Sequence, residues 1–280
     1  MHAIEGRMDP VIIAGLIALG IAAGLLGGIF GLGGGIVFVP VLLLVFGLPP
    51  SVAAATSLIG IIAGSAGASA MQIDSGHANI RLGLFLEIAT AIGAVIGAAL
   101  AVYLDDTILL VIFAAVLVMS GFRMATNKQK EIEESEKRGG MFDFSYTDDE
   151  GKERHYSVEH PVGSVPMCIG AGMISSMTGV GGGTIKVPLM NLYMKVPIKV
   201  ATATSSYMIG ITALTGAVVY IMDGVVDFDY AAGIAIGAFA GSMLGVLVAR
   251  RLNARHLKKY FGVLLFFIAA IILLQAGGIL

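Results

Sequence analysis

The apolar positions of this chain fall into ten runs, separated by short polar or glycine-rich links and by one long polar stretch. Most of these runs approach the ~20 apolar residues that a straight helix needs to cross a bilayer. The pattern predicts helices at 11–30, 36–46, 52–73, 82–104, 108–124, 162–178, 185–194, 200–222, 230–250 and 257–275. It is typical of an all-α protein that crosses a membrane several times.

The long polar stretch, residues 126–160, separates the fifth apolar run from the sixth. Its first part, NKQKEIEESEKR, predicts a charged helical extension. Its second part, MFDFSYTDDEGKERHYSVEH, alternates apolar and polar residues on either side of Asp-Asp-Glu-Gly, which predicts a β-hairpin in water. We interpret the charges of this insert as a solvated surface.

The parts of the chain before and after the insert resemble each other. When the sequence is shifted by 148 residues, the segment from residue 14 to residue 117 aligns without a gap. The matches include Gly31 with Gly179, Pro40 with Pro188, Pro49 with Pro197, Thr56 with Thr204 and Ser57 with Ser205. We therefore predict two copies of one unit of five apolar segments, residues 8–125 and 161–280, joined by the insert.

The first seven residues belong to neither copy. They contain Ile-Glu-Gly-Arg, a protease cleavage sequence, directly before Met8, so we interpret residues 1–7 as the scar of an expression vector. The apolar run after Pro10 lacks the basic residues that precede the apolar part of a secretion signal. We expect this run to be the first membrane helix and expect no cleavable signal peptide.

Composition supports the membrane assignment and narrows the range of partners. Of the 280 residues, 57% are hydrophobic and 13% are charged, against about 25% charged residues in a soluble domain. No basic domain is present, so we expect a lipid bilayer and no nucleic acid as partner. We interpret the lone Cys168 as a small buried hydrophobe and the methionines as core residues. The five histidines are scattered, so we expect no metal site and no cofactor.

Charged links between the apolar runs predict how the two copies are oriented. Lys and Arg crowd the link at 250–259, whereas its counterpart in the first copy, 105–106, holds two aspartates. Conversely, Arg81 lies in a link whose counterpart, 223–229, is acidic. Because Lys and Arg mark cytoplasmic links, we predict inverted copies, a cytoplasmic insert (126–160) and both termini outside. Five segments in each copy satisfy the odd number of crossings that this requires.

Both copies place a glycine run directly before their shortest apolar run. GIFGLGGGIVFVP at 28–40 has its counterpart in SMTGVGGGTIKVP at 176–188. A helix over 36–46 reaches about 17 Å, against the ~30 Å of hydrocarbon in a bilayer. The break must therefore lie at membrane depth, where non-helical backbone is tolerated only inside protein or beside a water-filled cavity. Interrupted segments at matching points of two repeats are typical of the central site of a transporter, near the membrane midplane.

The glycine runs also indicate a ligand. Successive glycines let backbone N–H groups converge on one anion, and the short helix that follows directs its free N–H groups and positive dipole end to the same place. The backbone candidates are Gly33, Gly34, Gly35, Gly181, Gly182 and Gly183. Glycines at four-residue spacing, such as Gly20 with Gly24 and Gly93 with Gly97, are assigned instead to close helix packing.

Side chains near the breaks extend the candidate site. A lysine at membrane depth costs ~2.5–3.5 kcal/mol, so Lys186 either faces a cavity or snorkels to an interface. The hydroxyl candidates are Thr56, Ser57, Thr184, Thr204 and Ser205. Such hydroxyls either donate to an oxyanion, bond back to their own helix or serve close helix packing. Glu87 either carries a proton or lies at the cytoplasmic interface, and we favour the interface.

The chain resembles the sulfite/sulfonate exporter family of the TauE/SafE type in two motifs of each copy. These motifs are GLGGGIVFVP and PPSVAAATS in the first copy, and GVGGGTIKVP and VPIKVATATSS in the second. The resemblance covers nearly the whole chain outside residues 1–7 and the insert. It implies an inner-membrane secondary transporter that moves sulfite, sulfoacetate or related sulfur-containing anions, generally outward and with the proton gradient. The family signature falls on Gly31, Gly33–Gly35, Pro40, Thr56, Ser57, Gly179, Gly181–Gly183, Lys186, Pro188, Thr204 and Ser205. The insert is longer than the resemblance implies, which leaves room for regulation or partner binding.

Three classes of function compete. The favoured one is a plasma-membrane secondary transporter that exports a small sulfur-containing anion by alternating access, with proton coupling. The alternative is an anion channel or passive anion pore, because paired half-helix ends also occur in channels. An enzyme with a nucleotide site is rejected, because the glycine run follows an apolar helix rather than a strand and no acidic residue lies ~20 positions further on.

Overall fold

The computed structural model describes residues 9–73, 76–126, 140–147, 152–249 and 255–278. The helices of the first half are α1 (Pro10–Phe30), α2 (Gly35–Leu44), α3 (Pro50–Ile73), α4 (Ile80–Tyr103) and α5 (Asp106–Thr126). Strands β1 (Phe144–Thr147) and β2 (Glu153–Tyr156) follow, and then a 3-10 turn (Val162–Ser164). The second half contains α6 (Val165–Thr178), α7 (Gly183–Pro188) with its π-helical continuation (Leu189–Tyr193), α8 (Ile198–Met222), α9 (Phe228–Ala249) and α10 (Arg255–Ala276).

The predicted helical class is confirmed, and each of the ten apolar runs contains helix. Within the described residues, six helices are long and apolar enough to cross a membrane: α1, α3, α4, α5, α8 and α9. Three sequence predictions fall at least partly on residues that are not described: the vector scar at 1–7, the charged extension that begins at 127, and the first half of the basic link 250–259, residues 250–254.

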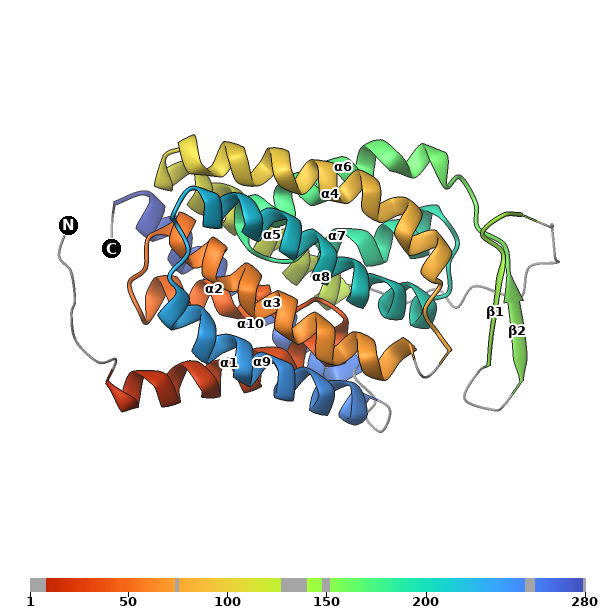
Figure 1. The fold of residues 1–280 in the computed structure, drawn as a ribbon, viewed down its shortest axis with the longest axis horizontal. Coiled ribbons are helices and arrows are strands. Elements are labelled where there is room, and N and C mark those ends of the chain that lie inside the picture. The colour runs from red at the N-terminus through yellow and green to blue at the C-terminus, as the bar shows by residue number, and fades with distance from the viewer. Residues whose placement is uncertain (1–8, 74–75, 127–139, 148–151, 250–254, 279–280) are drawn as a thin grey trace.

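Each glycine run makes the chain fold back on itself. A Cβ atom on Gly15, near the start of α1, would lie 3.9 Å from the ring of Phe46, just beyond the end of α2. In the second half, the ring of Tyr193 at the end of the π-helical turn lies 5.6 Å from that of His160, just before α6. The pairs α1–α2 and α6–α7 are therefore helical hairpins in which the second helix turns back along the first (Figure 1). The five segments of a copy are thus not five successive passes in alternating directions.

The tips of the two hairpins meet inside the molecule. A Cβ atom on Gly183 would lie 2.7 Å from the carbonyl oxygen of Gly31, and one on Gly35 would collide with the carbonyl of Gly179. Ile61 of α3 and Ile209 of α8 pack against both tips and are fully buried. The glycine breaks are thus enclosed by protein, as non-helical backbone in a membrane requires.

Glycines with four-residue spacing bring helices from different halves into close contact, as predicted. A Cβ atom on Gly24 of α1 would lie 2.5 Å from the carbonyl oxygen of Ala238 in α9. Gly93 and Gly97 of α4 approach the backbone of α6 in the same way, at Ile169 and Met173. The two halves therefore share their helix layers instead of forming separate bundles.

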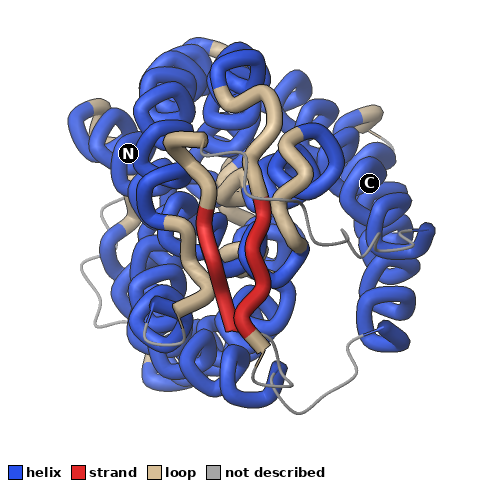
Figure 2. Tube along the Cα trace, turned by 90° about the vertical axis from the view of Figure 1, so that its right-hand side faces the viewer, coloured by secondary structure: helices blue, strands red, loops and turns tan. Residues whose placement is uncertain are grey.

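The described part of the polar insert contains the predicted β-hairpin. Strands β1 and β2 are antiparallel, with Phe144 opposite Tyr156, and they lie across one end of the helices (Figure 2). The Asn79 side chain caps α4 through Leu82 N–H and donates from Nδ2 to the Phe142 carbonyl and the Tyr156 hydroxyl. Burial raises the pKa of Tyr156 well above its ordinary value, although its Asn79 hydrogen bond opposes this, so the hydroxyl keeps its proton at physiological pH.

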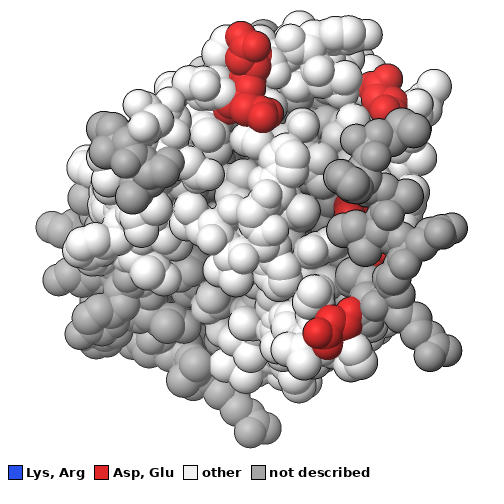
Figure 3. Space-filling model, turned by 90° about the vertical axis from the view of Figure 1, so that its left-hand side faces the viewer, with Lys and Arg blue, Asp and Glu red and all other residues white. Residues whose placement is uncertain are grey.

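The two ends of the molecule differ in charge. The start of α1 and the end of α10 lie at the end opposite the hairpin (Figure 1). Figure 3 shows that face with Asp and Glu and without Lys or Arg among its described residues. The helix termini there carry Asp9, Asp105, Asp106, Asp223, Asp227 and Asp229. The hairpin end carries Arg81, Lys152, Arg154, Lys195 and Lys199.

Candidate functional site

The facing hairpin tips offer backbone N–H groups to the interior. Gly33 and Gly34, with φ of 79° and 83°, and Gly181 and Gly182, with φ of 87° and 70°, adopt the left-handed conformation that favours glycine. Each tip continues directly into a helix, α2 or α7. Among the described residues, the backbone hydrogen bonds outside the helices leave the N–H groups of 33–35 and 181–183 unused. Predicted backbone candidates from both halves are thereby brought together.

Buried hydroxyl groups lie on the helices that contribute to or pack against the tips. Thr56 and Ser205 are fully buried on α3 and α8, and Thr184 lies in the first turn of α7. None of these three hydroxyls has a hydrogen-bond partner within the described structure. Ser175 of α6 is a fourth such hydroxyl, and a Cβ atom on Gly182 would lie 3.1 Å from it. A buried hydroxyl without a partner is costly, which indicates a ligand or water at this place.

Two of the predicted hydroxyl candidates are already engaged. Ser57 donates to the carbonyl of Gly179 over 2.7 Å and so ties α3 to the second tip. Thr204 accepts a hydrogen bond of 3.0 Å from the backbone N–H of Asn79. These side chains hold the hairpin tip and the start of α4 in place, and the ligand role expected of Ser57 and Thr204 stays a prediction.

Lys186 lies in the protein interior and forms a buried ion pair. Its side chain is 1% exposed, and its Nζ donates to Glu87 Oε2 of α4 over 3.1 Å. Nζ also donates to the hydroxyl of Thr212 of α8, which in turn donates to Glu87 Oε1. Snorkelling of Lys186 and an interfacial Glu87, which is 3% exposed, are therefore both wrong.

The ion pair lies about one helical turn from the second tip. Lys186 follows Gly182 by four residues, and side chains on a helix lean toward its N-terminus, here toward the tip. Thr212 lies one turn beyond Ile209, which packs on both tips. In the first half, the position of Lys186 is taken by Phe38, which is fully buried and packs against Gly60. The charged group is thus confined to one side of the tips.

Sequence reasoning did not assign Ser175, Thr212 and Arg123 to the site. Arg123, near the end of α5, donates from Nη1 to the Thr184 carbonyl over 3.2 Å and adds a second cation beside the second tip. The sequence could have indicated Arg123, because it is a charged residue inside the predicted membrane helix 108–124 and such residues rarely face lipid. Ser175 and Thr212 had no comparable signal, because small polar residues are common in these helices.

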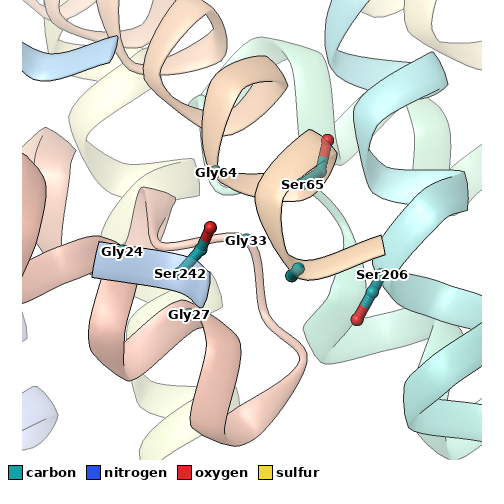
Figure 4. Close-up of a pocket in the computed structure, with 8 residues that line it drawn as sticks. Gly24, Gly27, Gly33, Gly64, Ser65, Ser206 and Ser242 are labelled. Atoms are coloured by element: carbon teal, nitrogen blue, oxygen red, sulfur yellow. The ribbon is translucent and has the colours of Figure 1, made fainter. Parts of the chain in front are cut away.

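A small pocket lies beside the first tip. Glycines of α1, α3 and the tip line it, together with Ser65, Ser206 and Ser242 (Figure 4). Each of these hydroxyls donates to a carbonyl of its own helix, and Ser65 and Ser206 point away from each other in Figure 4. The pocket therefore offers no converging donors, in contrast to the second tip.

Comparison with known proteins gives a consistent result. The family model described as Sulfite exporter TauE/SafE matches residues 16–272. The probable membrane transporter protein YunE of Bacillus subtilis is 30% identical, over 90% of this chain and 94% of its own. A probable membrane transporter protein of Xylella fastidiosa is 26% identical, over 90% and 89%. Sulfite exporter TauE/SafE family protein 5 of Arabidopsis thaliana is 31% identical over 85 residues, 30% of this chain and 19% of its own. No solved structure matches this chain significantly.

Proposed function

This chain belongs to the sulfite exporter TauE/SafE family of membrane transporters, and we propose that its substrate is a small sulfur-containing anion, sulfite or an organosulfonate such as sulfoacetate. In this proposal the anion is exported by alternating access, with protons as the coupling ion. It binds between the two hairpin tips, where it accepts hydrogen bonds from the glycine N–H groups and from Thr56, Thr184 and Ser205.

The observation that carries the proposal is the excess of donors at the tips. The glycine N–H groups at 33–35 and 181–183 and the buried hydroxyls lack partners in the described structure. Lys186 and Arg123 add two cations near the second tip, against one carboxylate, Glu87. A surplus of donors and cations over carboxylates suits an oxyanion better than a metal cation. Sulfite and sulfonate groups present three oxygens, which match such a donor set.

The orientation proposed from sequence is supported by the charges of the two ends. We place the hairpin end, where the described Lys and Arg residues gather, in the cytoplasm, and the acidic end outside. This puts the insert 126–160 in the cytoplasm and both termini outside. It also makes the membrane units 8–125 and 161–280 inverted copies, which meet at equivalent glycines in the middle of the fold.

A direct test is anion binding to the purified protein in detergent. Sulfite, sulfate, thiosulfate and sulfoacetate, with acetate as the carboxylate control, are titrated against the wild type and Thr56→Val. Selective binding of a sulfur anion that weakens at least about tenfold in Thr56→Val supports the proposed site, since a hydrogen bond to a charged group contributes about 1.5–3 kcal/mol. Thr215→Val is the matched control, because that hydroxyl only bonds back to Ile211.

The alternative, an anion channel, is separated from a carrier by flux measurements in proteoliposomes. A carrier gives a rate that saturates with anion concentration and accelerates when unlabelled anion is present on the far side. A channel gives no such acceleration. Absence of binding by every sulfur anion would remove the proposed substrate class while leaving the family assignment in place.

A further inference from the structure

We propose that Arg123 is a positioning residue for the anion site. In this proposal Arg123 gives the carbonyl of Thr184 the hydrogen bond that Pro188 cannot give, and so fixes the first turn of α7 beside the second tip. The inference rests on the function proposed above. It assigns a helix of the first half, α5, a part in the binding geometry of the second half.

The sequence of α7 leaves one of its carbonyl groups without a backbone donor. In an α-helix the carbonyl of residue i accepts from the N–H group of residue i+4. The fourth residue after Thr184 is Pro188, which has no N–H group. One position further on, the Leu189 N–H donates to the Ile185 carbonyl, so the helical bonding resumes directly after the gap. Thr184 is buried, and a buried carbonyl without a donor is costly.

Arg123 supplies the missing donor from another helix. Its Nη1 donates to the Thr184 carbonyl over 3.2 Å, across 61 positions of the chain. Within the described residues this is the hydrogen bond that Arg123 makes, and no carboxylate pairs with its guanidinium. The contacts of Arg123 therefore point to the backbone of α7 and not to a charged partner.

The first turn of α7 determines the geometry of the second tip. The N–H groups of Ile185 and Lys186 both donate to the Gly182 carbonyl, over 3.1 Å and 2.9 Å. A shift of this turn therefore moves Gly182 and the unused N–H groups around it. Thr184 also carries one of the buried hydroxyls without a partner. Because α7 has only six residues before it continues as a π-helical turn, a bond to its first turn holds the proposed anion donors in place.

The first half has the same gap in its short helix but lacks the guanidinium. Under the shift of 148 residues, Ile36 and Pro40 of α2 occupy the matching positions, and Pro40 again has no N–H group. Continued to the end of α5, the shift places Ile271 of α10 opposite Arg123. Ile271 is an exposed apolar residue whose side chain has no donor. The support is thus specific to the second tip.

The test compares anion affinities in detergent, with sulfite and sulfoacetate as probes and acetate as the control anion. Arg123→Met removes the donor and should weaken binding about tenfold or more, the effect of one hydrogen bond from a charged group. Pro188→Ala restores a backbone N–H group, and its helical φ of −69° and ψ of −32° suit alanine. In the Pro188→Ala background the Thr184 carbonyl has its own donor, so adding Arg123→Met should change the affinity little.

Calorimetric titration separates this role from a general effect on stability. The measured stoichiometry reports the folded fraction, whereas the dissociation constant reports the site in the molecules that are folded. A residue that only stabilised the fold would change the stoichiometry and leave the dissociation constant unaltered. Phe122→Met, at the exposed neighbouring position of α5, is the matched control and should bind like the wild type.

Three results would overturn the inference and leave the proposed function standing. The first is an Arg123→Met variant that binds like the wild type. The second is a weakened variant that Pro188→Ala does not rescue, since Arg123 would then act through its charge. The third is a double variant that fails to fold or bind although Pro188→Ala binds, and this comparison decides even if Arg123→Met alone does not fold.

A further variant covers the case in which Pro188→Ala itself does not bind. Arg123→Gln keeps an N–H donor without the charge and should bind the probes more tightly than Arg123→Met. Equal weakening by the two replacements would overturn the inference. Failure of the wild type to bind either probe would instead refute the proposed function.

Discussion

Gly35 is the residue where the contact between the two hairpin tips is tightest. A methyl group there would meet the Gly179 carbonyl and the Ile61 side chain. We predict that Gly35→Ala separates the tips and destabilises the protein by about 1–3 kcal/mol, the range found when well-packed interiors are overfilled. Thermal unfolding in detergent measures this loss, and anion binding should be lost with it.

Gly170→Ala provides the control for this substitution. Gly170 is also a helical residue in a membrane segment, but nothing lies within 4 Å of an added Cβ atom. Alanine is favoured over glycine in a helix by roughly 0.5–1 kcal/mol, so this variant should be at least as stable as the wild type. Equal stability of the two variants would contradict the close contact of the tips.

Lys186 gives a second prediction at this scale. Lys186→Met leaves the Glu87 carboxylate buried without a partner, which costs about 3–5 kcal/mol. The double variant Lys186→Met with Glu87→Gln removes both charges and should recover most of that stability, although it should not bind the anion. Chemical or thermal unfolding of the three variants forms a double-mutant cycle. Additive losses would show that the two charges do not interact.

Residues of the site differ in how far sequence could reveal them. The glycine runs and Lys186 could be found, because glycine clusters and charges are unusual inside apolar runs. The pairing of Lys186 with Glu87 could not be found, because 99 residues separate them and the shift of 148 residues matches Lys186 to Phe38. Similarly, all four hydroxyl residues of the two matched Thr-Ser pairs look alike in sequence. Only the fold shows that Ser57 and Thr204 hydrogen-bond to neighbouring backbone, whereas Thr56 and Ser205 have no such partner.

At the scale of elements, sequence predicted which segments are helical and which one is too short to cross. It did not predict that α1 and α6 turn back with α2 and α7. Hydrophobic length indicates whether a helix reaches across a bilayer, whereas the direction after a break depends on contacts with distant helices. Those contacts are glycine faces on α9 and α4, whose spacing was visible in sequence but whose partners were not.

The junction between the β-hairpin and α4 allows a test of one element contact. Asn79 caps α4 and also binds the hairpin through Phe142 and Tyr156. Asn79→Ala should therefore lower stability by ~1 kcal/mol through the cap and release the hairpin to proteases. Tyr156→Phe removes one hydrogen bond and keeps the cap, so its proteolysis should change much less. Identical proteolysis of Asn79→Ala and the wild type would exclude a fastening role for Asn79.

At the scale of the whole molecule, the charge difference between the two ends predicts the orientation in the membrane. The only cysteine, Cys168, is buried, so single cysteines can be added without removing others. In intact cells, Asp105→Cys should react with a membrane-impermeant thiol reagent, and Ser145→Cys in β1 should react only after the membrane is opened. The unaltered protein is the control and should remain unlabelled. The reverse pattern would invert the proposed topology.

Phe38 and Lys186 occupy matching positions in the two copies but differ in polarity. The free-energy cost of hydrating the hairpin tips therefore differs between their two sides. Water that reaches the tips past Phe38 meets an aromatic ring and glycines, whereas water that arrives past Lys186 meets an ion pair that it can hydrate. The barriers for opening toward the two compartments must therefore differ, even though the backbone of the two hairpins is similar. An asymmetric carrier of this kind has a different apparent anion affinity on each face, so uptake and efflux started from the same imposed concentration saturate at different anion concentrations.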